Sequence, residues 1–171
     1  MMRGLNWLIP GFSVAVLTVL AALPWGLPSE SRFFLPLLPF TAIHIWTLRS
    51  PGQIPEWLVF LAGLAIDVLS HGPLGFWSLM LLLGRSLVLV LPPPQDWAFY
   101  GRWLHFCATL LALALAQWIV ASAYFMNWIE WSPLARSAFA ASFTYPLIEL
   151  LLRPFNRSWS RTHNPSLLRG A

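Results

Sequence analysis

An apolar run that is interrupted once by helix-breaking residues is the feature that most constrains this chain. The run extends from residue 56 to residue 91 and is divided by the tetrapeptide SHGP at 70–73. Gly72 permits backbone angles that other residues avoid, and Pro73 lacks an amide hydrogen and disfavours helix at the residue before it. The pattern therefore predicts a tight hairpin of two apolar helices.

The composition indicates that this hairpin belongs to an integral membrane protein of one domain. Hydrophobic residues make up 58% of the 171 residues and charged residues only 9%, with a mean hydropathy of +0.67. Soluble domains are about a quarter charged. The net charge of +4 comes from arginines spread along the chain, so we expect no nucleic-acid partner. Cys107 is the one cysteine, which excludes an intrachain disulfide.

Six apolar segments are predicted to cross the membrane, giving an all-α six-helix transmembrane bundle over residues 1–152. An Arg-rich cytoplasmic tail without fixed structure is predicted at 153–171. Several spans are only about 15–16 residues, ~23 Å against ~30 Å of hydrocarbon. We expect their boundaries to extend into Trp-rich flanks; the alternative is that neighbouring helices shelter the short ones. The predicted spans are 8–25, 33–48, the two halves of the hairpin, 103–125 and 137–152.

The N-terminal segment has two possible interpretations, and the arginines indicate one orientation of the chain in the membrane. Arg3 followed by an apolar run could be a cleaved signal peptide, but the remaining chain is itself apolar, so a first span is preferred. The positive-inside rule then puts both termini in the cytoplasm and the hairpin tip outside. Arg32 and Arg136 fall on the outer side, and the inner side holds Arg3, Arg49, Arg102, Arg153, Arg157, Arg161 and Arg169.

One carboxylate, Asp67, is predicted to lie about one helical turn before the hairpin tip. A charge that faced lipid there would cost a few kcal/mol, so Asp67 needs a partner. We expect it to accept hydrogen bonds from the backbone or from Ser70 and His71; the alternative is contact with a partner protein or a ligand. An aspartyl protease would need a second carboxylate at the same site, and Asp96 is predicted on the opposite side.

Two other charges and two glycines fall within the predicted spans. Arg85 and Glu149 are expected at depths that differ by ~5 Å, so they could form an ion pair. The equally favoured alternative is that Arg85 extends to the membrane interface. Gly63 and Gly84 are small enough to allow close approach of helices.

No catalytic or cofactor motif is present in the sequence. The four histidines share no metal-ligand spacing and are expected at different depths, which predicts no metal site. Neither a glycine-rich phosphate loop nor a serine or cysteine nucleophile signature occurs. We therefore expect no catalytic residues, no cofactor and no metal. The histidines are His44, His71, His105 and His163.

Residues 33–91 resemble the MreD family, rod shape-determining proteins of the bacterial inner membrane. The similarity lies in PEW at 55–57, in the Gly63 to Asp67 spacing, in PLG at 73–75, and in HIWTLRSP at 44–51. Elsewhere the resemblance rests on size and hydropathy. The chain departs from the family pattern at the tip, where His71-Gly72 stands in place of small or Ser/Gly residues.

This resemblance implies a non-enzymatic scaffold of the cell-elongation complex. The implied partners are an MreC-like periplasmic protein, an MreB-like actin homologue, and a RodA-type polymerase with its transpeptidase. The implied fold is similar to the substrate-binding membrane subunit of energy-coupling-factor transporters. The arginine tail would meet cytoplasmic partners or anionic membrane lipids. The implied docking hairpin contains Gly63, Asp67, His71, Gly72, Pro73 and Gly75.

A transporter subunit that binds a small molecule is the alternative function. Short, proline-interrupted spans near a lone carboxylate can line a cavity in such proteins. The two functions differ in a measurable way, because a transporter subunit would hold a stoichiometric ligand.

Overall fold

The structure, a computed structural model, describes residues 8–23, 26, 34–49, 51–91 and 99–163, with side chains described up to residue 152 except at position 51. Every regular element in these residues is helical, so the predicted all-α fold is confirmed. The elements are α1 (Leu8–Ala22), α2 (Leu37–Arg49), the short 3-10 helix η3 (Pro51–Gln53), α3 (Glu56–Ser70), α4 (Phe76–Val90), α5 (Phe99–Tyr124) and α6 (Ser132–His163).

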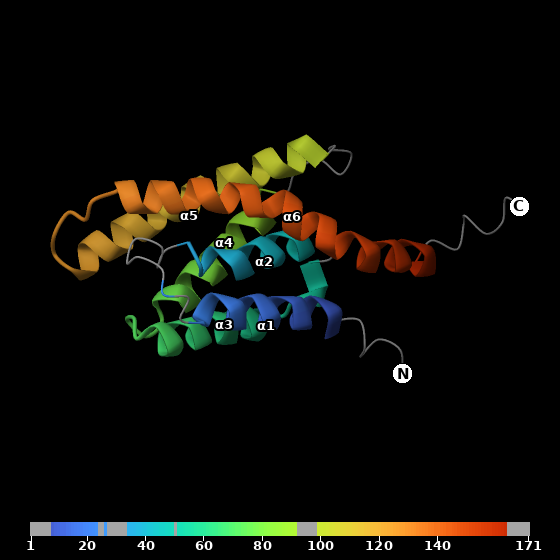
Figure 1. Cartoon of the computed structure of the whole chain (residues 1–171), viewed down its shortest axis with the longest axis horizontal. Coiled ribbons are helices and arrows are strands. Elements are labelled where there is room, and N and C mark those ends of the chain that lie inside the picture. The colour runs from blue at the N-terminus through green and yellow to red at the C-terminus, as the bar shows by residue number, and fades with distance from the viewer. Residues whose placement is uncertain (1–7, 24–25, 27–33, 50, 92–98, 164–171) are drawn as a thin grey trace, which may run out of the picture.

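Successive long helices run in opposite directions, so the bundle has two distinct ends (Figure 1). We call one the arginine end: α2 and α4 finish there, α3 and α5 begin there, and it carries Arg49 and Arg102. The other is the hairpin end, which holds the α3–α4 turn and the α5–α6 connection. Helix α1 begins and α6 finishes on the side of the arginine end, at the right of Figure 1.

Helix α2 forms the centre of the bundle. Ten of its 13 residues are buried, and it packs against α1, α4 and α6. A helix that is apolar on all sides is stable only when it is enclosed. Its Phe40 ring stacks on Phe106 of α5 at a centroid distance of 6.0 Å, and Phe106 stacks on Tyr145 of α6 at 4.8 Å. Aromatic side chains from three helices thus fill the core.

The length of α2 corrects one expectation. We predicted that the second span would reach outward into its flanks, but the helix covers only residues 37–49 and is sheltered by its neighbours. The prolines at 36 and 39 fall at its very start, where a missing amide hydrogen costs no helical hydrogen bond.

The two glycines that we singled out lie where helices approach closely, as predicted. A Cβ atom on Gly63 of α3 would stand 2.3 Å from the backbone Cα of Ser78 in α4. A Cβ atom on Gly84 of α4 would stand 2.4 Å from the Phe40 ring of α2. Gly63 therefore permits contact between two backbones, and Gly84 provides the space for a core aromatic ring.

Helix bounds agree with the sequence best in the hairpin and least at the C-terminal end. Helix α3 has the bounds that we predicted. Helix α6 begins five residues before the predicted span and continues through residues 153–163, which we expected to lack structure. Polar composition suggested a tail, yet residues 155–163 contain neither glycine nor proline to end the helix. The three prolines at 92–94 predict a rigid connector and the polar sequence LPSESR at 27–32 predicts a loop; both segments lie outside the described residues.

By length and apolarity, α5 is the one described helix that could cross a membrane unaided. It has 26 residues, ~39 Å at 1.5 Å per residue. Helices α1 and α4 are apolar but shorter, with 15 residues each.

Candidate functional site

Asp67 joins the two helices of the hairpin through backbone hydrogen bonds. Its Oδ2 accepts a hydrogen bond from the backbone N–H of Gly75 at 2.8 Å, and its Oδ1 accepts one from the N–H of Trp77 at 3.0 Å. These donors belong to the start of α4, where the first amides lack helical partners and the dipole favours an anion. The carboxylate is fully buried. Asp67 lies on α3 and caps the start of α4. The prediction that it accepts hydrogen bonds from the backbone is confirmed, and the donors are Gly75 and Trp77 on the far side of the turn.

The turn between these helices uses left-handed backbone at two positions. His71 has a φ of 54°, and Gly75 has a φ of 90°. We expected Gly72 to supply this freedom, which was wrong, because the positive φ values fall on either side of it. Histidine is one of the residues that tolerate the left-handed region, and it ends α3 here. The Gly72 N–H donates to the Asp67 carbonyl at 3.2 Å. The backbone of Asp67 therefore ends α3, and its side chain caps the start of α4.

Replacing Asp67 by asparagine is expected to lower the free energy of unfolding by about 1–3 kcal/mol. The amide nitrogen would face a backbone N–H where the carboxylate accepts a hydrogen bond, leaving one buried donor unsatisfied. Chemical unfolding of the purified protein in micelles measures the effect. Ser70→Ala, which removes an exposed hydroxyl from the same turn, is the control; equal stability of the Asp67→Asn variant and this control would contradict the capping role.

At the arginine end, Glu149 of α6 lies between two arginines from other helices. Its Oε1 accepts a hydrogen bond from Arg49 Nη2 of α2 at 3.0 Å and one from Arg102 Nη2 of α5 at 2.8 Å. The side chain of Glu149 is only 8% exposed, against 17% for Arg49 and 33% for Arg102. This cluster ties α2, α5 and α6 together and carries a formal charge of one positive unit.

The predicted ion pair between Arg85 and Glu149 is wrong. Arg85 donates instead to Glu56 Oε1 and to the Ile54 carbonyl, both at 3.1 Å. The reason is helix adjacency: α4 packs on α2, α3 and α5, whereas α6 packs on α2 and α5. Arg85 and Glu149 lie at a similar depth, but the helices that carry them are not close neighbours. Arg85 is buried, and its extension to the membrane interface stays a prediction.

Two histidines meet in the core near the arginine end. His44 Nε2 of α2 lies 3.0 Å from His105 Nδ1 of α5, and His105 Nε2 lies 2.6 Å from the Leu91 carbonyl. Since a carbonyl only accepts, His105 carries a proton on Nε2. A hydrogen-bonded chain thus joins His44, His105 and the Leu91 carbonyl.

Sequence reasoning missed this pair because we expected the histidines at different depths. A usable signal existed. His44 lies five residues before the end of α2, and His105 lies six residues after the start of α5, at the same end of the bundle. Among the described residues, no three His, Cys, Asp or Glu side chains come together as a metal site would require.

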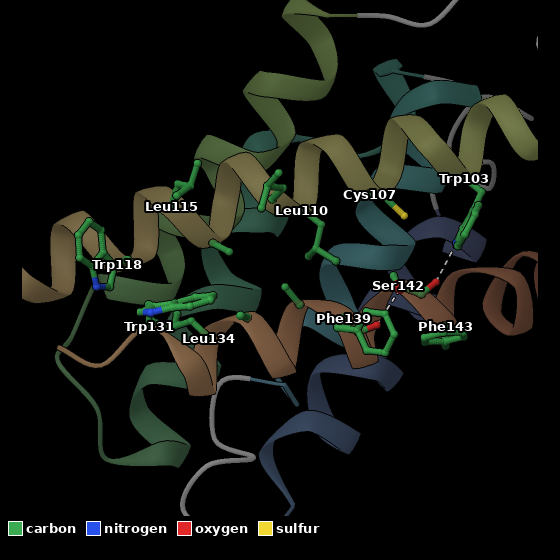
Figure 2. Close-up of a pocket in the computed structure, with 14 residues that line it drawn as sticks. Trp103, Cys107, Leu110, Leu115, Trp118, Trp131, Leu134, Phe139, Ser142 and Phe143 are labelled. Atoms are coloured by element: carbon green, nitrogen blue, oxygen red, sulfur yellow. Dashed lines mark hydrogen bonds between the residues drawn. The ribbon is translucent and has the colours of Figure 1, made fainter.

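A long apolar groove lies between α5 and α6 (Figure 2). Its volume is about 690 Å³, and its lining carries no charged side chain. Cys107 lines it and is half-buried. Trp103 and Trp118 stand toward its opposite ends. The full lining is Trp103, Cys107, Leu110, Leu111, Ala114, Leu115, Trp118, Trp131, Leu134, Ala135, Ala138, Phe139, Ser142 and Phe143.

The indole N–H of each of these two tryptophans donates a hydrogen bond to a backbone carbonyl. Trp103 Nε1 donates to the Ser142 carbonyl at 3.0 Å, and Trp118 Nε1 donates to the Ile129 carbonyl at 2.8 Å. The Ser142 carbonyl is available because Pro146, four residues on, has no amide hydrogen to donate to it. A proline inside α6 thereby creates the acceptor that holds a side chain of α5.

The six residues of the predicted docking hairpin divide into two groups. Gly63, Asp67 and Gly75 take part in the contact between α3 and α4. His71, Gly72 and Pro73 form the tip, and the first and third of these are exposed. Whether the tip binds a partner stays a prediction.

Comparisons of the chain with protein-family models, with curated proteins and with solved structures gave no match.

Proposed function

We propose that this protein is a non-enzymatic membrane scaffold of the bacterial cell-elongation complex. It would cross the inner membrane six times, with both termini in the cytoplasm. The proposal rests on the resemblance of residues 33–91 to the MreD family, and the structure adds physical support to it. The partners would be an MreC-like protein, an MreB-like actin homologue, and a RodA-type polymerase with its transpeptidase.

The observation that carries the proposal is the structural role of Asp67 in the hairpin. This buried carboxylate has both oxygens committed to backbone N–H groups, so it serves to fix the hairpin. A fixed hairpin presents its tip in one orientation, and Leu74 at that tip is 74% exposed. An exposed apolar side chain on a rigid support is a suitable anchor for a protein partner.

The outer surface of the bundle supports residence in a membrane. Large apolar side chains are exposed on α1, α3, α4, α5 and α6, including Phe12 at 73% and Leu147 at 68%. Soluble monomers rarely expose contiguous apolar patches larger than a few hundred Å². Charged side chains of the described residues gather near the two ends of the bundle, where a bilayer would place its headgroups. Arginines outnumber acids at the arginine end, which favours that end in the cytoplasm.

Gene depletion tests the proposed function directly. In a rod-shaped host that carries this gene, depletion is expected to give round cells, and expression of the wild-type chain is expected to restore rods. Unchanged cell shape after depletion would contradict the scaffold role.

Co-purification with the MreC-like partner tests the hairpin tip. Leu74→Ala is expected to reduce recovery of the partner, while Leu147→Ala, an equal truncation of an exposed leucine on α6, is expected to leave it unchanged. Equal recovery with both variants would argue against docking at the tip.

The transporter alternative has less support. It required a cavity near the lone carboxylate, but Asp67 is bonded to backbone and does not line the groove, which lies between α5 and α6. A stoichiometric small ligand other than a membrane lipid in the purified protein would reverse this preference.

A further inference from the structure

We infer that the groove between α5 and α6 binds one anionic phospholipid of the cytoplasmic leaflet, with an acyl chain along the groove and the headgroup beside Arg102. This inference goes beyond the scaffold role, and it rests on the proposed residence of the bundle in a membrane with the arginine end in the cytoplasm. It rests on the groove lining, on the charge at one end of it and on the continuation of α6.

The groove is suited to an acyl chain because its lining is almost entirely apolar and two of its three indole N–H groups are engaged. The indole N–H groups of Trp103 and Trp118 donate to backbone carbonyls, so both rings present apolar surface to the groove. Alanines at 114, 135 and 138 leave room between the aromatic side chains. Figure 2 shows the lining side chains directed between the two helices. An occupant of this space must itself be apolar over that length.

Charge distinguishes the two ends of the groove. At the hairpin end, Glu130 and Arg136 are both exposed and offset each other. At the arginine end, Arg102 precedes the groove residue Trp103, and Glu149 lies seven residues after the groove residue Ser142, on the same face of α6. Among the described side chains, two arginines share one carboxylate here, so net positive charge lies at this end of the groove.

Positive charge continues along α6 past this cluster. Arginines follow Glu149 at positions 153, 157 and 161, one every four residues of a helix that extends to His163. These 14 further residues add ~21 Å of helix beyond Glu149. Basic clusters next to a membrane span attract anionic headgroups.

The groove is long enough for an acyl chain of one leaflet. From Trp103 to Trp118 it follows fifteen residues of α5, ~22 Å at 1.5 Å per residue. Half of a ~30 Å hydrocarbon core is about 15 Å. An acyl chain whose headgroup lies at the arginine end would therefore end near Ala114.

Native mass spectrometry of the full chain, released from nanodiscs of equal phosphatidylglycerol and phosphatidylcholine, tests the inference. The wild-type protein is expected to retain one phosphatidylglycerol in preference to phosphatidylcholine. Arg102→Gln is expected to reduce that preference about fivefold, the effect of one basic residue near an anionic surface. Arg136→Gln, at the hairpin end, is the matched control and should leave the preference unchanged.

A second pair of variants tests the groove independently of charge. Ala138→Trp fills the groove and is expected to abolish retention of either lipid, whereas Ala140→Trp, on an exposed face of α6 outside the groove, is expected to retain it. A melting temperature near that of the wild type shows that each variant is folded. Equal retention of the two lipids by the wild type, or unchanged retention in folded Ala138→Trp, overturns the inference. Cell shape plays no part in this assay, so its result is separate from that of the scaffold proposal.

Discussion

Replacing Gly63 by leucine is expected to abolish accumulation of the folded protein. A Cβ at this position would lie 2.3 Å from Ser78 Cα and 2.4 Å from Ser78 N, which are backbone atoms that cannot move without separating α3 from α4. Separation would also break the two hydrogen bonds by which Asp67 caps α4. The amount of monodisperse protein after extraction in mild detergent measures the outcome.

The smaller change Gly63→Ala gives a graded version of this test. We expect a loss of about 3 kcal/mol in the free energy of unfolding, at the upper end for overpacked sites, despite a gain of about 1 kcal/mol in helix propensity. Ser78→Gly should give no rescue, because the collision involves backbone. Gly72→Ala in the same hairpin meets only the Ser70 hydroxyl at 3.4 Å and is the control. Normal stability of Gly63→Ala would show that the two helices do not pack as described.

Replacing Glu149 by glutamine is expected to destabilise the protein by about 3–5 kcal/mol, the range for breaking a buried ion pair. The change would leave Arg49 and Arg102 close together, without the carboxylate that both of them contact. Chemical unfolding in micelles measures the loss. Glu56→Gln is the matched control: Glu56 pairs with Arg85 but is 77% exposed, and such pairs contribute only about 0–1 kcal/mol.

A double substitution separates the observed pairing from the one that we predicted from sequence. Adding Arg49→Met to Glu149→Gln is expected to recover part of the lost stability, because one of the two uncompensated charges is then removed. Exchanging the charges of Arg85 and Glu149 is expected to give no recovery. Recovery by that exchange would contradict the arrangement at the arginine end.

The sequence was sufficient to locate the helices wherever glycine and proline punctuate it. The bounds of α3 and the turn that follows it came directly from the apolar run and the SHGP break. Composition was a poor guide beyond Leu152, because arginine-rich polar sequence was read as a tail although nothing in residues 155–163 ends a helix. Glycine and proline therefore predicted where helices end, and polar composition alone did not.

The pairing of side chains between helices could not be read in the same way. Arg85 and Glu149 were matched by depth, but depth says nothing about which helices are neighbours. The central place of α2 was equally hidden, since an apolar helix enclosed by protein and one exposed to lipid have the same composition. The contact between His44 and His105 could have been found by counting residues from the helix ends.

The bond from Trp103 to the Ser142 carbonyl has a mechanical consequence. A proline within a helix commonly introduces a kink, because the carbonyl that it leaves unpaired turns outward toward another donor. Here an indole from the adjacent helix supplies that donor, so bending of α6 at Pro146 would pull on Trp103. The C-terminal part of α6 is thus coupled to the start of α5, and a force applied to that part would be transmitted into the bundle.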